Sequence, residues 1–177
     1  ALITAMPGFT VVVPSDSIET EWAVREAASI DGPVYIRLSR GATPVVHSGT
    51  ENTFKIGKAE EIRGGNDATI IACGVMVSIA QQAADLLSNE GVETRIINMH
   101  TLAPIDSDAI VSAAKETGII ITAEEHFVRG GLNSIVSQEL GARYPTPIER
   151  VALDSYGESG KPGQLLEKYG LGTGKIV

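Results

Sequence analysis

The sequence predicts an α/β fold: an open, mostly parallel, Rossmann-like sheet with helices on both faces, preceded by a partial strand-helix-strand unit. Two observations lead to this prediction. Short apolar runs of strand length alternate with segments whose apolar residues recur at helical spacing, and Gly, Pro, Asn and Asp separate them. Such alternation indicates right-handed crossover units, which place the strands parallel and cover both faces of the sheet.

The first 40 residues predict one strand-helix-strand unit. A strand at residues 11–13 is followed by Asp16 and Glu19, a pair whose spacing forms a capping box at the start of a helix. Apolar residues at helical spacing continue to Ile30, where the helix is expected to end, and residues 34–38 form the next strand. Two strands are too few for an independent domain, so the chain is expected to begin inside a larger fold.

A linker is expected between Arg40 and Thr53, because this segment is polar, contains Gly and Pro and lacks helical spacing. We place the domain boundary near residue 50, which divides the chain into domains 1–50 and 51–177. The two strands of the first domain would lack neighbours. The sequence therefore predicts either self-association or disorder before residue 50.

The second domain is expected to begin with an edge strand or hairpin at residues 54–62 and to continue as alternating strands and helices. The expected strands are residues 69–73, 94–98, 118–123 and 148–152. The expected helices are residues 76–89, residues 106–117, a helix that carries Leu132 to Leu140, and a short C-terminal helix at 161–169.

The composition argues against several classes of protein. The formal net charge of −8 and the lack of a basic stripe argue against a nucleic-acid-binding surface. The chain shows no signal sequence and no apolar run of about 20 residues, so we expect no membrane span and a cytoplasmic location. Cys73, the single cysteine, has no disulfide partner and lies in a strand that is expected to be buried.

Arg40 is the strongest candidate for a ligand-binding residue. A guanidinium offers a planar fork of donors suited to phosphate oxygens, and open α/β sheets bind ligands beyond the carboxyl ends of their strands, where Arg40 is expected. An exposed arginine beside Gly41 is the alternative interpretation, and spacing alone leaves both open. Arg37 alternates to the other face of the strand and is expected to be structural.

A run of charged residues, Glu124, Glu125 and His126, closes another expected strand. Acid-base chemistry is one interpretation, and a solvated or interface-forming strand end is the one we favour. Three histidines, His47, His100 and His126, have no short ligand spacing, and no second cysteine is present. No metal site is expected from this pattern.

A small nucleotide-binding domain is a rival interpretation. Gly74 follows a strand, and Gly130 and Gly131 open a helix, so backbone N–H groups at either place could face an anion. No Gly-x-Gly-x-x-Gly motif accompanies them. Asn98 ends the second strand, where a dinucleotide site would have an acidic residue.

Several ordered motifs run along the chain: Met6 to Thr10 with Pro14 to Asp16, Leu38-Ser39-Arg40, Asn98 to Asp106, Thr122 to His126 with Gly130 to Leu132, and Gly157 to Gly160. Together they resemble the thiamine-diphosphate-dependent transketolase family over essentially the whole chain. The motif that ends at Arg40 points to transketolase rather than to 1-deoxyxylulose-phosphate synthase, whose equivalent usually has tyrosine and proline before the arginine.

The resemblance implies the end of the family's middle, pyrimidine-binding domain followed by its C-terminal domain, as in a transketolase C-terminal subunit truncated on its N-terminal side. It implies that the complete enzyme transfers a two-carbon ketol group between sugar phosphates with thiamine diphosphate and Mg²⁺. An N-terminal transketolase subunit is the implied partner, and a homo-oligomer is the implied assembly. Arg40 matches the family's arginine that contacts the substrate phosphate.

Other parts of the family's site have no counterpart in these residues. The chain contains no Gly-Asp-Gly, and the glutamate that activates the aminopyrimidine ring belongs upstream of Ala1 by resemblance. We therefore assign no catalytic, cofactor-binding or metal-binding residue, and expect the chain alone to be inactive and cofactor-free. Alternatives are a non-catalytic interaction domain or, within the family, 1-deoxyxylulose-phosphate synthase or the β subunit of a 2-oxo acid dehydrogenase.

Overall fold

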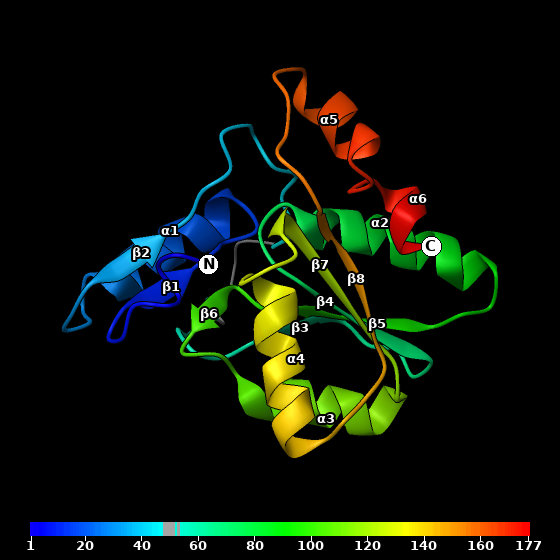
Figure 1. Ribbon diagram of the computed structural model, residues 1–177, viewed down its shortest axis with the longest axis horizontal. Helices are drawn as coiled ribbons and strands as arrows, with labels where there is room; N and C mark the ends of the chain where they lie inside the picture. Colours follow the sequence, from blue (N-terminus) through cyan, green and yellow to red (C-terminus); the bar gives the residue numbers. More distant parts are fainter. Residues whose placement is uncertain (48–51, 53) are drawn as a thin grey trace.

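The structure is a computed structural model that describes residues 1–47, 52 and 54–177. Its strands form a five-stranded sheet and a three-stranded sheet, with helices packed around them (Figure 1). The expected domain boundary near residue 50 lies outside the described residues.

The five-stranded sheet has the order β3-β5-β4-β7-β8. Its strands are β3 (Glu60–Arg63), β4 (Ala68–Ala72), β5 (Thr94–Asn98), β7 (Ile120–Phe127) and β8 (Ile148–Leu153). β4 is parallel to β5 and β7, and β7 is parallel to β8, whereas β3 pairs antiparallel with β5 at one edge. The mostly parallel sheet that the sequence predicts is confirmed.

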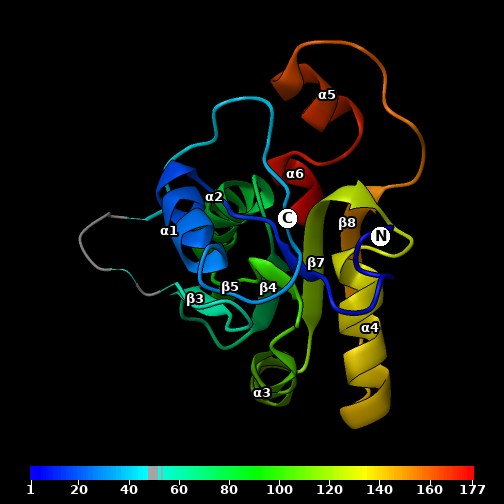
Figure 2. The same cartoon turned by 90° about the vertical axis from the view of Figure 1, so that its left-hand side faces the viewer.

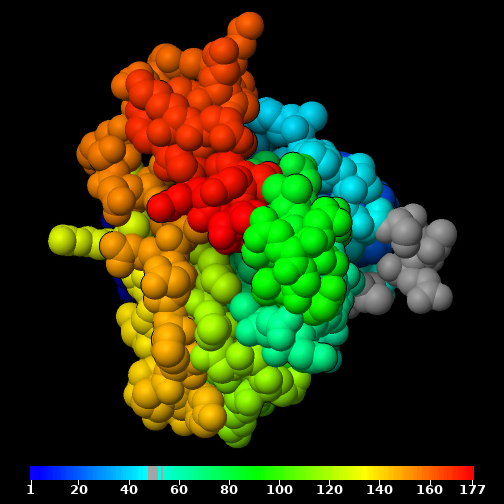
Figure 3. All heavy atoms as spheres, turned by 90° about the vertical axis from the view of Figure 1, so that its right-hand side faces the viewer, coloured from blue at the N-terminus to red at the C-terminus, as the bar shows by residue number. Residues whose placement is uncertain are grey.

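Helices cover both faces of this sheet, as expected (Figure 1). The helices are α2 (Met76–Asn89), α3 (Ser107–Thr117), α4 (Leu132–Arg143), α5 (Pro162–Lys168) and α6 (Thr173–Ile176). α3 and α4 pack on one face, and α2 and α6 pack on the other, where Figure 3 shows the red α6 against the green α2. Ile70 and Ile71 of β4 join different apolar clusters, because successive side chains of a strand point to opposite faces.

The three-stranded sheet has the order β2-β1-β6 and joins segments that are far apart in the sequence. β1 (Thr10–Val12) is parallel to β2 (Val34–Ile36) and antiparallel to β6 (Thr101–Ala103), a strand that the sequence did not predict. The expectation that both N-terminal strands lack neighbours is therefore wrong for β1. Val11 and Val12 are buried in consequence. The prediction of self-association or disorder before residue 50 stays a prediction.

The first helix, α1 (Ser17–Ala27), starts where the capping box predicts and ends before Ile30. Asp16 is the N-cap and accepts a hydrogen bond from the backbone N–H of Glu19. At the other end, both the backbone N–H and the hydroxyl of Ser29 donate to the Glu26 carbonyl. Because these bonds span three residues rather than four, the last turn tightens and the helix stops early.

The expected strand or hairpin at 54–62 is correct only at its C-terminal end, where β3 begins at residue 60. Before that, side chains from other elements accept the backbone N–H groups. Glu26 accepts from Ile56, and Asp106 accepts from Ala59. A segment whose donors are satisfied this way does not pair as a strand.

The strand expected at 118–123 is β7, which is longer than predicted and continues to Phe127. Its extension carries Glu124, Glu125 and His126, and Phe127 pairs with Leu153 of β8 after an irregularity in register. Among the described residues, no helix combines the length and the apolar character that crossing a membrane requires.

Candidate functional site

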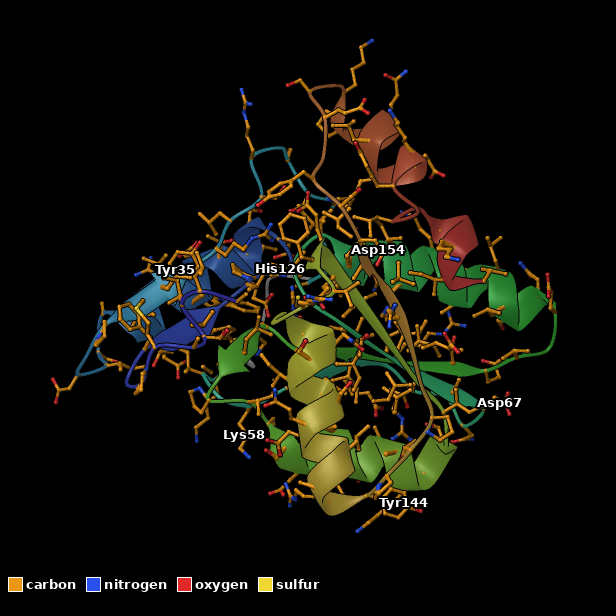
Figure 4. The ribbon with its side chains drawn as sticks, in the orientation of Figure 1. Tyr35, Lys58, Asp67, His126, Tyr144 and Asp154 are labelled. Atoms are coloured by element: carbon orange, nitrogen blue, oxygen red, sulfur yellow. The ribbon has the colours of Figure 1, made fainter. Side chains whose placement is uncertain are left out.

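A cleft of about 560 Å³ lies where the two sheets meet. Tyr35 of β2 and His126 of β7 line it from the two sheets (Figure 4), and Val13 and Cys73 belong to its wall. The cleft opens at the carboxyl ends of β4 and β7, the edge at which open α/β sheets bind ligands. Its wall is mainly apolar, with the charged side chains of residues 37 and 124–126 at one side.

Glu124 is buried in this wall, with 1% of its surface exposed. Its two carboxylate oxygens accept hydrogen bonds from the backbone N–H groups of Leu132 (2.6 Å) and Asn133 (2.9 Å), the first residues of α4. Burial raises the pKa of the Glu124 carboxyl, and these two hydrogen bonds oppose the shift. The interpretation of this residue as a solvated strand end is therefore wrong: Glu124 caps a helix.

Arg37 connects the two sheets beside the cleft. Its Nη2 donates to the backbone carbonyl of Glu125 at 2.9 Å and lies 3.8 Å from the Glu125 carboxylate. This contact fits the structural role that strand alternation predicts for Arg37. Burial lowers the pKa of His126, although the hydrogen bond between its Nδ1 and the Phe127 carbonyl opposes the shift.

Arg40 follows β2 by four positions and is exposed. Within the described residues its guanidinium makes no hydrogen bond or ion pair, and it does not line the cleft. Arg40 is thus available to an external ligand, but it does not line the cleft that Glu124, Glu125 and His126 line.

The nucleotide-binding interpretation meets two obstacles. The N–H groups at the start of α4, which follow Gly130 and Gly131, already bind the Glu124 carboxylate. The turn at Gly74 is covered by the chain after β1, because the N–H of Gly74 donates to the Val13 carbonyl at 3.2 Å. A side chain at position 74 would also meet Val13 Cγ1, so this glycine permits close packing rather than anion binding.

A second polar group, made of Asp16, Glu19, His47 and Glu60, lies between α1 and β3. The sequence pattern had placed these residues in separate segments. His47 belongs to the segment that was expected to be a linker, and only 7% of it is exposed. Its Nδ1 lies 2.9 Å from Asp16 Oδ2, and its Nε2 lies 2.9 Å from Glu60 Oε2. Burial lowers the pKa of His47, but the hydrogen bonds to Glu60 and Asp16 outweigh it and raise the pKa to about 9.

Comparison with known proteins identifies the fold's family. The family model described as "Transketolase, C-terminal domain" matches residues 57–176. The chain belongs to the transketolase family. Its relatives in this family include the 6-deoxy-6-sulfo-D-fructose transketolase subunit of Clostridium sp. (strain MSTE9), 41% identical over 100% of this chain and 55% of that protein.

Another relative is one of the subunits of the apulose-4-phosphate transketolase from Phocaeicola vulgatus, 37% identical over 97% of this chain and 55% of that protein. A solved structure titled "Split gene transketolase, inactive beta4 tetramer" superimposes with a TM-score of 0.96 at 41% identity, covering 99% of this chain and 58% of that one. This chain therefore spans about half the length of the transketolase relatives that it matches.

The described residues do not fit the diphosphate end of thiamine diphosphate. The polar side of the cleft presents the carboxylates of Glu124 and Glu125, which would repel a diphosphate, and the nearest guanidinium, that of Arg37, is paired with Glu125. No chemical step through the cofactor is therefore derived from these residues.

Proposed function

We propose that this chain is the C-terminal part of a transketolase that transfers a two-carbon ketol group between sugar phosphates. In the assembled enzyme an N-terminal subunit supplies the thiamine diphosphate and Mg²⁺ site, and copies of this chain associate with one another. Alone, the chain is inactive. Its likeness to single subunits of two transketolases over nearly its whole length carries this proposal.

Residues 1–50 are proposed as the end of the pyrimidine-binding domain with its linker, and residues 51–177 as the C-terminal domain. The family match supports this division, because it begins at residue 57, just after the proposed boundary. The three-stranded sheet then contains strands of both domains, since β6 belongs to the second and β1 to the first.

Arg40 is proposed to bind the substrate phosphate. Arg40 is exposed and follows the carboxyl end of β2. Its guanidinium forms no ion pair or hydrogen bond with the described residues. A phosphate accepts parallel hydrogen bonds from both arms of such a group. Arg40 would not have to leave an ion pair with another described residue in order to bind a phosphate.

The test is steady-state kinetics of the enzyme reconstituted with its N-terminal subunit. Arg40→Ala is expected to lower kcat/KM for a phosphorylated ketose by about 10-fold to 100-fold, the loss of one charge-assisted hydrogen bond of about 1.5–3 kcal/mol. An unphosphorylated ketol donor should be affected little. Arg25→Ala is the control, because Arg25 lies on an exposed helix surface and, among the described residues, forms an ion pair with Glu21 alone.

Unchanged kinetics in Arg40→Ala would eliminate the phosphate-binding role. An interaction domain without substrate contacts is the second candidate, favoured by the structural roles of Glu124 and Arg37 in the cleft. This second candidate predicts that substitutions in the chain change its affinity for the N-terminal subunit and leave the KM for phosphorylated donors unchanged. A reconstituted complex with no ketol-transfer activity would refute the enzyme assignment itself.

A further inference from the structure

The buried polar group between α1 and β3 has the composition of a metal site that combines one imidazole with two carboxylates. We infer that Nε2 of His47 and the carboxylates of Glu19 and Glu60 bind one Zn²⁺ ion. One ligand atom from each of these residues lies within 4.8 Å of the other two. None of these residues lines the cleft.

The spacing of the ligand atoms suits one ion. His47 Nε2 lies 2.9 Å from Glu60 Oε2 and 4.0 Å from Glu19 Oε1. Two atoms bound to the same zinc ion at about 2.1 Å and a tetrahedral angle are about 3.4 Å apart. The observed distances fall on either side of that value, so small side-chain rotations would complete the coordination.

His47 is oriented as metal-binding histidines usually are. Its Nδ1 faces Asp16 Oδ2 at 2.9 Å, and the same oxygen accepts the backbone N–H groups of Val46 (2.7 Å) and His47 (2.9 Å). These three contacts fix the carboxylate of Asp16, and a fixed carboxylate holds the proton on Nδ1. The other nitrogen, Nε2, is then the one that can bind a metal.

The charge of the group favours a cation. Three carboxylates, those of Asp16, Glu19 and Glu60, surround the imidazole of His47, and the Asp16 and Glu19 side chains are at most 1% exposed. The ring of His100 also approaches this group, with its Nε2 4.0 Å from Glu19 Oε1, so the carboxylates outnumber the imidazoles. A buried excess of negative charge is costly unless a cation compensates it. The proton that His47 shares with Glu60 would leave to solvent when the ion binds.

Asn98 gives an independent indication. It is completely buried, and its Nδ2 donates to Glu19 Oε1 at 2.8 Å, the oxygen assigned to the ion. Its Oδ1 has no hydrogen-bond partner among the described residues. Buried amide oxygens nearly always have a donor. A water molecule on the ion's open coordination position would supply one.

The ligand set selects the kind of ion. Mg²⁺ and Ca²⁺ prefer oxygen ligands alone, whereas imidazole favours zinc and the later transition metals. Zn²⁺ accepts a mixture of histidine nitrogen and carboxylate oxygen.

The ion would connect α1 to the edge of the five-stranded sheet. Glu19 lies in the first turn of α1, and Glu60 begins β3, which faces α1 in Figure 2. Bound zinc should therefore slow amide hydrogen exchange at residues 17–27 and 60–63 together. A non-specific surface ion would not have this effect.

The test is isothermal titration of Zn²⁺ into the chelator-stripped chain, followed by X-ray absorption at the zinc edge. We expect one ion per chain and a coordination shell of nitrogen and oxygen atoms. The absence of sulfur from that shell would exclude Cys73 as a ligand. His47→Gln should abolish saturable binding. Glu60→Gln, at a side chain that is 25% exposed, should weaken saturable binding at least 10-fold.

His126→Gln is the matched control, because His126 is a partly exposed histidine outside the cluster, and it should bind Zn²⁺ as the unsubstituted chain does. Equal affinity in Glu60→Gln and the unsubstituted chain would overturn the assignment, even if His47→Gln failed to fold. Absence of saturable binding, or a sulfur ligand in the absorption spectrum, would overturn it as well. Competition by Mg²⁺ at equal concentration would contradict the choice of ion.

Discussion

Removal of the Glu124 carboxylate should destabilise the chain through α4. In Glu124→Ala, the backbone N–H groups of Leu132 and Asn133 lose their acceptors in a buried environment. Each charge-assisted hydrogen bond contributes about 1.5–3 kcal/mol, and the cost of burying the carboxylate, which raises its pKa, offsets part of the sum. We expect a net loss of about 2–4 kcal/mol in the free energy of unfolding.

Gly131→Ala perturbs the same contact from the other side. A Cβ at this position would collide with Glu124 Oε2 and with His126 Nδ1. The backbone of Gly131 is extended, with φ −92°, so alanine adopts it without strain and the collision is the whole cost. Displacing a buried side chain by one methyl group costs about 1–3 kcal/mol.

The two substitutions together separate this explanation from general damage. In Glu124→Ala the carboxylate is gone, so a methyl group at position 131 occupies vacated space. Only the approach to His126 Nδ1 then remains, so the double variant should lose less stability than the two single losses added together, a coupling of about 1–3 kcal/mol. Urea unfolding monitored by circular dichroism measures the free energy of unfolding of the unsubstituted chain, the two single variants and the double variant. Losses that add without coupling would refute the proposed contact.

Two further predictions concern the core and a helix cap. Burial raises the pKa of the Cys73 thiol, so little thiolate exists at pH 8. An aromatic disulfide reagent should therefore label Cys73 only after the chain is unfolded in urea. Immediate labelling of the native chain would contradict the prediction. Asp106→Ala should lower the free energy of unfolding by about 1–3 kcal/mol, because Asp106 caps α3 at the N–H of Ala109 and also accepts the N–H of Ala59. Differential scanning calorimetry measures the loss, with the exposed Asp108→Ala as control, and equal stability of the two variants would contradict the prediction.

The sequence predicted those features that depend on neighbouring residues. Asp16 caps α1 as expected, because a capping side chain bonds to a backbone group three positions away, and α3 begins beside Asp106, where a helix was expected. The central strands were located because their apolar runs are buried on both faces of the sheet. Cys73 was correctly expected to be buried for the same reason.

The features that escaped prediction depend on pairs far apart in the chain. β6 is short and only partly buried, and pairing with β1 more than 80 positions away makes it a strand. Glu124 resembled a solvated strand end because the helix that it caps begins eight residues later. Charge and exposure are properties of the folded neighbourhood, so a local pattern of acidic residues does not reveal whether they face water or a helix terminus.

His47 shows the same limit for a candidate site. Metal-site arguments from sequence rely on ligands a few positions apart, because one turn or loop then holds them together. Here 28 positions separate His47 from Glu19, and 13 separate it from Glu60. The proposed ligands meet because β3 and α1 lie close together in the folded chain, with His47 between them. A site assembled in this way becomes visible only when the arrangement of both sheets is known.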